Sequence, residues 1–337
     1  MSIKKFSRCN ILSNVPKVLV TRRQFKDQVN RLAEVSEVIH LERPSPPSRT
    51  ELKRYVENCA GIFAHITDSI DAEIMDAAGK NLKIIAEFGV GYDNINVVDA
   101  SNRNIAVANT PGILTETAAD FAFTVIQSAA RRIAESDRYV RNGNWKWFDP
   151  LDLLGLDING SILGIVGFGR IGGALAKKAL GSGMKVVYFS RSKPKDDYGC
   201  KRLDSLDELL QTSDFVSLHC PLTDSTKGLI GEKELLTMQS HSVLINTARG
   251  PIVDTNALTE ALLDKQISYA ALDVTDPEPI PSNHKLLSLD NVTILPHIAS
   301  ATIGTRRKMS EMTVDNIISG IEDKIPPHCV NVDEIDW

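Results

Sequence analysis

The chain has 337 residues, of which 42% are hydrophobic and 24% are charged, and its net charge is −5. This length exceeds what a single hydrophobic core usually supports, so we expect two domains. The mildly acidic balance disfavours non-specific nucleic-acid binding, and no apolar run approaches the roughly 18 residues that a membrane helix needs. The five cysteines are far apart and form no C-x-x-C pair, which favours reduced thiols in a cytoplasmic protein over disulfides or a metal site.

The N-terminus is basic, because seven cationic residues precede the first acid, Asp27. They are Lys4, Lys5, Arg8, Lys17, Arg22, Arg23 and Lys26. A poorly ordered terminus explains this pattern, and organellar targeting is the alternative that stays open.

In the first third of the chain, short β-branched runs alternate with segments of helical period, which is typical of an α/β domain with a parallel sheet. The predicted strands are residues 17–21, 37–42, 61–66, 82–88 and 105–110. An uninterrupted helix is predicted from Thr115 to about Arg141, and the aromatic loop "NWKWFDP" (144–150) follows it.

A second α/β series follows, with six predicted strands at 161–167, 186–190, 214–220, 242–248, 267–274 and 292–296. Their number and rhythm match a doubly wound dinucleotide fold. A last helix, about 300–323, has no strand after it, so we expect it to pack back on the first domain. The predicted fold is therefore α/β with two doubly wound parallel sheets. A flavodoxin-like substrate domain comprises 1–113 and 299–337, and a Rossmann nucleotide-binding domain comprises 114–298.

A G-x-G-x-x-G motif directly follows the strand "ILGIV" and opens a helix, and in this context the motif indicates a dinucleotide site. Its first glycine permits the tight turn, the second lets the backbone approach a pyrophosphate, and the third lets helix and strand pack closely. The predicted cofactor-binding residues here are Gly167, Phe168, Gly169, Arg170, Ile171 and Gly172.

The second strand of this unit ends in "VVYFSRSK", where an acid that binds the ribose hydroxyls usually stands. The loop instead offers Ser190, Arg191 and Ser192. An arginine can bind a 2′-phosphate through charge-assisted hydrogen bonds, whereas a carboxylate would repel it. These residues favour NADPH/NADP over NADH as the cofactor. A solvated basic loop on an NAD-dependent protein is the alternative.

Three ionisable residues stand at predicted strand ends: Arg249 after "SVLINTA", Glu278 in "DVTDPEPIP", and His297 after "VTILP". Because the carboxyl ends of parallel strands face one crevice, we expect the three to converge beside the nicotinamide. A cation binds a carboxylate, an imidazolium protonates a carbonyl oxygen, and a carboxylate keeps that imidazole charged and oriented. Together they indicate reduction of a 2-keto acid, while His284 is interpreted as structural.

The segments "GFGRIG", "NTARG", "ALDVTDPEP" and "LPHIASAT", in this order and spacing, resemble the D-isomer-specific 2-hydroxyacid dehydrogenase family over residues 17–325. The resemblance implies that Arg249, Glu278 and His297 are catalytic. It implies substrate binding by the backbone of Val90 and Gly91, in "EFGVGYDN", together with Arg249, His297 and Ser300. Further dinucleotide contacts are implied at Thr115, Pro221, Thr247, Asp273 and Ala299.

Two departures from the family pattern bear on specificity. "HIAS" stands where the family commonly has "HIGS", so Ala299 adds a methyl group beside the expected cofactor. Phe148 falls about where related reductases often carry tryptophan. In the family this loop can reach the site of a neighbouring subunit, although ordinary dimer packing by Trp145, Trp147 and Phe148 is the favoured interpretation. A homodimer through the nucleotide-binding domain and the 144–150 loop is expected.

Within the family, residues 275–302 are most similar to the branch that reduces glyoxylate and hydroxypyruvate. The expected activity is NADPH-dependent reduction of these small 2-keto acids by hydride transfer. A 2-ketogluconate-type reductase or another D-2-hydroxyacid dehydrogenase, such as 3-phosphoglycerate dehydrogenase, is the nearer alternative. A dinucleotide-sensing corepressor of the same fold is the alternative from another class. No metal is expected.

Overall fold

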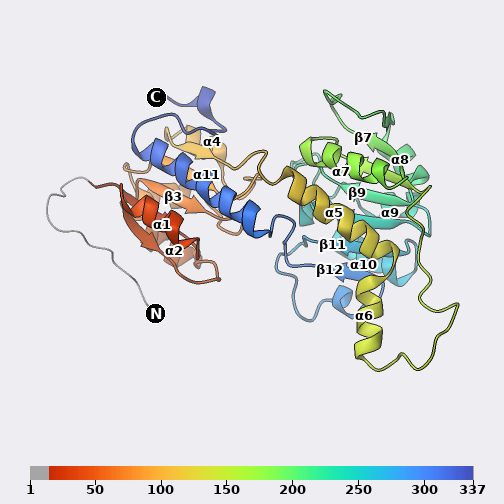
Figure 1. Cartoon of the computed structure of the whole chain (residues 1–337). Helices are drawn as coiled ribbons and strands as arrows, with labels where there is room; N and C mark the ends of the chain where they lie inside the picture. The colour runs from red at the N-terminus through yellow and green to blue at the C-terminus, as the bar shows by residue number, and fades with distance from the viewer. Residues whose placement is uncertain (1–14, 337) are drawn as a thin grey trace. The chain divides into compact units, whose positions relative to one another are not determined.

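The computed structural model describes residues 15–336, so Lys4, Lys5, Arg8 and Cys9 lie outside the described residues. The chain divides into two compact units (Figure 1). Unit 1 comprises the chain up to Leu114 together with the segment from Thr302 onward, and unit 2 runs from Thr115 to Ala301. No helix within residues 15–336 has the length and apolar character to cross a membrane.

Unit 1 is built on a five-stranded parallel sheet in the order β2-β1-β3-β4-β5. Its strands are β1 (Lys17–Val20), β2 (Glu37–His40), β3 (Gly61–Ala64), β4 (Ile84–Glu87) and β5 (Ala106–Ala108). Strands β3 to β5 are buried along their whole length, because helices cover both faces of the sheet. The five strands predicted in this part of the chain are confirmed.

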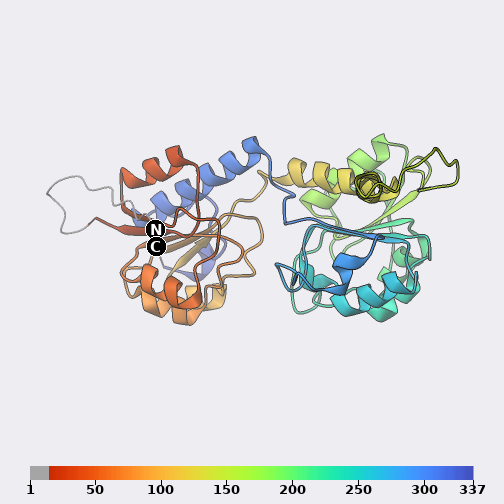
Figure 2. The ribbon, with the colours of Figure 1, turned by 90° about the horizontal axis from the view of Figure 1, so that it is seen from below.

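The helices of unit 1 form two layers, one on each face of the sheet (Figure 2). One layer holds α1 (Lys26–Ala33) and α11 (Ile303–Ile321), and the other holds α2 (Arg49–Val56), α3 (Ala72–Ala78) and α4 (Val97–Ser101). Helix α11 packs so closely on β4 that a Cβ at Gly320 would lie 2.7 Å from the Cβ of Ile84. A 3₁₀ turn, η3 (Val332–Glu334), follows near the end of the chain.

Unit 2 contains a seven-stranded parallel sheet in the order β12-β11-β10-β9-β6-β7-β8. Its strands are β6 (Ile162–Val166), β7 (Lys185–Phe189), β8 (Lys201–Arg202), β9 (Phe215–Leu218), β10 (Val243–Asn246), β11 (Tyr269–Leu272) and β12 (Val292–Ile294). The sequence predicted six strands and missed β8. This strand has only two residues, both charged and exposed, so it carries no apolar signal. The predicted α/β class with two parallel sheets is confirmed.

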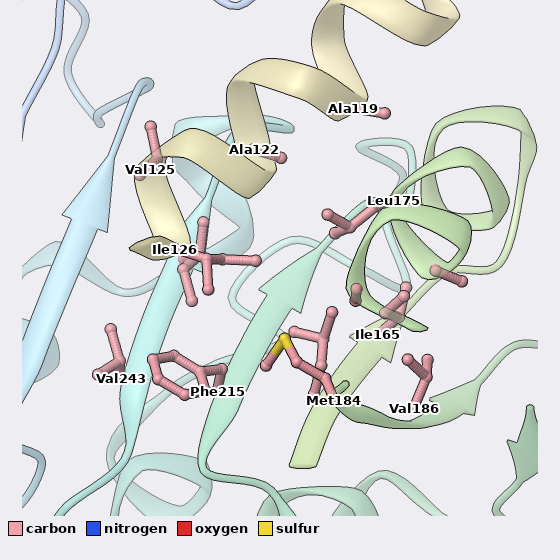
Figure 3. Close-up of a cluster of buried hydrophobic side chains, with 14 of the residues drawn as sticks. Ala119, Ala122, Val125, Ile126, Ile165, Leu175, Met184, Val186, Phe215 and Val243 are labelled. Carbon is pink, nitrogen blue, oxygen red and sulfur yellow. The ribbon is translucent and has the colours of Figure 1, made fainter. Parts of the chain in front are cut away.

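Two helical layers also enclose the sheet of unit 2. Helices α5 (Thr115–Ala130) and α7 (Arg170–Gly181) lie on one face, and α8 (Leu206–Thr212), α9 (Glu232–Thr237) and α10 (Thr255–Leu263) lie on the other. Figure 3 shows the core beneath α5 and α7, where Ala122, Val125 and Ile126 lie over Ile165, Phe215 and Val243 of the sheet. Two 3₁₀ turns, η1 (Gly250–Ile252) and η2 (Lys285–Ser288), complete the unit.

The helix predicted from 115 to 141 is in fact two helices, and that prediction was wrong. Helix α5 ends at Ala130, Arg132 adopts a left-handed φ of +51°, and α6 (Ile133–Arg141) follows. The Ala130 carbonyl accepts a hydrogen bond from the Leu156 backbone at 2.8 Å, so a distant segment takes an acceptor that α5 would have used to continue. The sequence has no glycine or proline at the break, because the break is caused by the contact of Leu156 with the end of α5 and not by a residue of the helix.

The residues after α6 form a projecting segment (Figure 1), and this segment exposes large apolar side chains. Trp145, Trp147 and Phe148 are 64%, 74% and 84% exposed, which is unusual for side chains of this size. Of the cysteines within the described residues, Cys59, Cys200, Cys220 and Cys329 are free thiols. The cytoplasmic location stays a prediction.

Candidate active site

The three predicted catalytic residues follow three neighbouring strands of unit 2. Arg249 stands three residues after β10, Glu278 lies in the loop after β11, and His297 lies three residues after β12. These strands are adjacent and parallel, in the order β12-β11-β10, so all three residues emerge at the same edge of one sheet. The glycine motif after β6 emerges at that edge as well.

Glu278 and His297 form a hydrogen-bonded pair. The distance between Glu278 Oε1 and His297 Nδ1 is 2.6 Å, which is short for a hydrogen bond between a nitrogen and an oxygen. Their side chains are 32% and 28% exposed, so the pair lies at the surface of the unit, accessible to a ligand. Nε2 of His297 has no hydrogen-bond partner between residues 15 and 336. The imidazole is therefore oriented through one nitrogen and accessible through the other.

The turn that carries His297 is held by Asp273, a buried carboxylate at the end of β11. Its two oxygens accept hydrogen bonds from the backbone N–H groups of Ile298 and Ala299, each at 2.8 Å. The N–H of His297 donates to the Asp273 carbonyl at 2.9 Å. These three bonds hold His297 at a φ of +56°, which a non-glycine residue adopts only when its surroundings impose it.

The family resemblance implied a cofactor contact for Asp273, and its part in this turn was not predicted from the sequence. These hydrogen bonds could not be predicted from local sequence, because the Asp273 carboxylate and the two N–H groups that donate to it are 25 and 26 positions apart. Burial raises the pKa of the Asp273 carboxyl. Ala299 is outside the positive-φ region, so its methyl group adds no backbone strain at the position where the family commonly has glycine.

Gly250 brings the segment after Arg249 against the loop that carries Glu278. A Cβ on Gly250 would lie 1.9 Å from the carbonyl oxygen of Thr275, so no larger residue fits without a shift of that loop. The N–H of Thr275 points to Glu278 Oε2 at 3.4 Å. Arg249 itself is half-buried, and its Nη1 donates to the Ala248 carbonyl at 2.8 Å. Close backbone packing thus connects two of the three strand ends.

The three glycines of G-x-G-x-x-G differ in whether the fold itself requires them. Gly167 has a φ of +92°, and a Cβ there would lie 2.6 Å from the backbone nitrogen of Cys220. A Cβ on Gly172 would lie 2.4 Å from the Gly167 carbonyl oxygen. Gly169 has an ordinary φ of −83° and open space around it. The protein itself therefore needs glycine at the first and third positions, but not at the second.

This arrangement fits a dinucleotide. Gly169 is the N-cap of α7, a helix of twelve residues, and its open side leaves room for a phosphate to approach the helix N-terminus. Phe168, in contrast, is a core residue. It is 5% exposed and packs against Tyr188, with the ring centroids 4.1 Å apart, so only its backbone is available to a ligand.

The loop with Ser190, Arg191 and Ser192 directly follows β7 and is mostly exposed. Its three side chains make no hydrogen bond to any residue that the structure describes. Its backbone is held from β8, because Nη2 of Arg202 donates to the Ser190 carbonyl at 2.9 Å and approaches the Arg191 carbonyl at 3.5 Å. Arg202 was not identified from the sequence, since β8 was not predicted.

In unit 1, Val90 and Gly91 follow β4 in a half-buried turn. Asn109 fixes this turn, because its Nδ2 donates to the Val90 carbonyl at 2.7 Å. The backbone N–H groups of Val90 and Gly91 have no hydrogen-bond partner among residues 15–336. Two adjacent donors of this kind suit a carboxylate.

The other predicted contact residues take the following places. Thr115 begins α5, Pro221 follows β9 by three residues, Thr247 directly follows β10, and Ser300 is half-buried after the His297 turn. Within the described residues, no group of three or more histidine, cysteine, aspartate or glutamate side chains is arranged to hold a metal ion.

Comparisons with known proteins agree on one family. A family model described as D-isomer specific 2-hydroxyacid dehydrogenase, NAD binding domain, matches residues 123–299. A glyoxylate reductase of Korarchaeum cryptofilum is 46% identical over 321 residues, which cover 94% of this chain and 96% of that protein.

Solved structures give the same result. A protein of Thermus thermophilus has a TM-score of 0.87 and 45% identity, with coverage of 93% of this chain and 99% of that one. An NADPH-dependent glyoxylate/hydroxypyruvate reductase of Sinorhizobium meliloti, in complex with NADP and malonate, has a TM-score of 0.82 and 31% identity over 96% and 99% of the two chains. Because the family model spans more than half of the chain and the Korarchaeum relative covers nearly all of it, this protein belongs to the D-isomer specific 2-hydroxyacid dehydrogenase family.

Proposed function

We propose that this protein reduces glyoxylate, and also hydroxypyruvate, with NADPH as the hydride donor. The observation that carries the proposal is the 2.6 Å hydrogen bond between Glu278 and His297, at the sheet edge that also bears the glycine motif. Relatives named glyoxylate reductase that are 40–46% identical over nearly the whole chain support the choice of substrate.

The bound dinucleotide supplies the hydride for the keto carbon. Nε2 of His297 donates the proton to the keto oxygen, while Glu278 holds Nδ1 and stabilises the imidazolium. The guanidinium of Arg249 binds the carboxylate and polarises the keto oxygen. The N–H groups of Val90 and Gly91, together with Ser300, bind the carboxylate. The dinucleotide contacts proposed besides the glycine motif are Thr115, Pro221, Thr247, Asp273 and Ala299.

The preference for NADPH is assigned to Ser190, Arg191 and Ser192. The support for it is the absence of an acid directly after β7, at positions 190–195, and the exposure of Arg191, whose side chain is available for a 2′-phosphate. Replacing Arg191 by alanine should raise the KM for NADPH much more than the KM for NADH. An equal change in both constants would show that the loop is only a solvated basic turn.

A steady-state comparison tests the substrate. Glyoxylate, hydroxypyruvate and 2-ketogluconate are each assayed with NADPH and with NADH, and kcat/KM is compared across the six pairs. Glyoxylate and hydroxypyruvate with NADPH should give the highest values. The highest value with 2-ketogluconate would assign the protein to the other type of reductase, and no turnover with any of the three would reject the proposed activity.

We also propose a homodimer formed through unit 2. The support is the apolar projecting segment, where Trp145, Trp147, Phe148 and Leu151 are 64–84% exposed, next to α6 with its exposed Ile133. Contiguous exposed apolar surface of this kind marks interaction sites in soluble proteins. A second copy of the same unit presents the same apolar segment and would cover it with two-fold symmetry.

A further inference from the structure

The short strand β8 carries a cation that neither the glycine motif nor the catalytic residues explain. Arg202 is exposed and makes no ion pair with any residue between 15 and 336. Its side-chain hydrogen bonds all go to the loop after β7: Nη2 donates to the carbonyl of Ser190 at 2.9 Å and lies 3.5 Å from the carbonyl of Arg191. Arg202 is therefore an exposed arginine that contacts the backbone of the 190–192 loop. It has no carboxylate partner among the described residues.

The contact has two physical consequences. It restrains the backbone that carries Ser190, Arg191 and Ser192, because a guanidinium binds carbonyl oxygens in a fixed planar geometry. It also leaves Nε and Nη1 of Arg202 without a partner among the described residues, so most of the donors of this guanidinium remain available beside the loop. The nearby acids are otherwise engaged, since Asp196 and Asp197 accept from the backbone N–H groups of Tyr198 and Gly199.

The neighbouring residue on the same strand provides an internal comparison. Lys201 is also exposed, but its Nζ lies 3.9 Å from Glu208, on α8, and it has no contact with the loop. Successive residues of a strand point to opposite faces, which explains why only one of the two cations reaches the loop.

We propose that Arg202 is a specificity-determining residue for the 2′-phosphate of the dinucleotide: it positions the 190–192 loop and adds a second guanidinium to that of Arg191. This inference rests on the proposed use of NADPH. It predicts that the selectivity for a 2′-phosphate is divided between two arginines, one in the loop after β7 and one on β8.

Equilibrium binding to the full chain tests this without turnover. Isothermal titration calorimetry compares NADP⁺ with NAD⁺, and adenosine 2′,5′-bisphosphate with 5′-AMP, for the unmodified protein and for Arg202→Ala, Arg202→Lys and Lys201→Ala. Arg202→Ala should weaken binding of the two 2′-phosphate ligands by about tenfold and leave NAD⁺ and 5′-AMP unchanged. Lys201→Ala should leave all four affinities unchanged. Arg202→Lys should recover part of the loss, because it restores the charge without the planar fork.

Two results would overturn the inference: unchanged affinity for the 2′-phosphate ligands in Arg202→Ala, or an equal loss for all four ligands, which would mean a purely structural role. Thermal unfolding of each variant verifies that it is folded.

The unmodified protein and Arg191→Ala distinguish a failure of the role proposed for Arg202 from a failure of the proposed cofactor. If the unmodified protein prefers NADP⁺ and Arg191→Ala removes that preference, a silent Arg202→Ala rejects only the role of Arg202. If the unmodified protein prefers NAD⁺, the proposed use of NADPH fails and the inference fails with it.

Discussion

His297 shows how one side chain is oriented by groups on another strand. Its left-handed backbone is imposed by Asp273, whose carboxylate accepts the next two N–H groups of the turn, and its Nδ1 is held by Glu278. Such a conformation costs free energy, of the order of 1 kcal/mol or more, and persists because the surrounding hydrogen bonds over-determine it. The imidazole is thus pre-oriented before any ligand binds.

Removal of the imidazole tests this at the scale of one residue. His297→Ala should lower kcat with glyoxylate by about 10²- to 10⁴-fold, the range of a general acid, while the Kd for NADPH changes only a few-fold. The matched control is His284→Ala, which removes a histidine from the loop before η2 and should leave kcat nearly unchanged. Equal losses of turnover and NADPH affinity in His297→Ala would contradict its role as proton donor.

The turn between β6 and α7 shows that a motif can combine folding and binding requirements. Gly167 and Gly172 are needed by the protein itself, because a Cβ at either would overlap backbone atoms of the same unit. Gly169 faces open space with an ordinary φ, so nothing in the fold explains it. The sequence motif treats these glycines alike, whereas the structure separates them.

Alanine at Gly172 should therefore reduce the stability of the fold, whereas alanine at Gly169 should reduce the affinity for the dinucleotide. Gly172→Ala should lower the free energy of unfolding by about 1–3 kcal/mol, the usual cost of overpacking, because the Gly167 carbonyl must move. Gly169→Ala should leave thermal stability nearly unchanged and weaken dinucleotide binding, since its methyl group occupies the open approach to the helix. Chemical denaturation and calorimetric titration measure the two quantities. Unchanged dinucleotide affinity in Gly169→Ala would mean that no ligand approaches there.

At the same scale, the elements that were mispredicted share a cause. Helical periodicity continues through residues 115–141, but the Ala130 carbonyl is taken by the Leu156 N–H, and the chain turns at Arg132. Strand β8 exists because it pairs with β7, not because its own two residues favour a strand. Predictions from local pattern succeed where an element is long and apolar, and fail where a partner distant in sequence decides.

In the whole molecule, two half-buried histidines couple folding to pH. Burial, together with smaller contributions from the charges of Arg22 and Arg306, lowers the pKa of His65 to about 3, and burial lowers that of His219 to about 4. Nδ1 of His65 lies 2.9 Å from Thr21 Oγ1, and its Nε2 lies 2.9 Å from Gln24 Nε2. Because the amide nitrogen of Gln24 is a donor, His65 must be neutral to accept from it.

Mild acid should therefore destabilise the fold. Between pH 6.5 and the lowered folded-state values, the unfolded chain binds protons at His65 and His219 that the folded chain excludes, so stability is lost as the pH falls. Each histidine should remove about 2 kcal/mol of unfolding free energy between about pH 7 and pH 5. Urea denaturation across this range measures the slope, and His65→Gln should reduce it by about half. A flat profile over the same range would contradict the burial of both neutral rings.

The proposed homodimer is a second property of the whole molecule, and it is predicted from the exposed apolar surface of unit 2. Phe148→Asp should shift the protein from dimer to monomer in light scattering coupled to size exclusion, because it places a charge in an apolar segment that the partner would cover. The control is Ile303→Asp, which adds the same charge at an 83% exposed isoleucine outside that segment, at the start of α11. If the unmodified protein is monomeric, or if Phe148→Asp remains dimeric, the proposed interface is wrong.

Local pattern in the sequence was sufficient to predict the two parallel sheets, the glycine turn, the loop without an acid and the three strand-end residues. Periodicity and turn chemistry are properties of neighbouring residues, so they can be recognised before the chain is folded. The break at Arg132, the contact of Arg202 with the 190–192 loop and the hold of Asp273 on the His297 turn became visible only in the folded chain. Each of these depends on hydrogen bonds between residues distant along the chain, which no local pattern encodes. The candidate residues of the site could thus be identified from the sequence, while their orientation is a product of the fold.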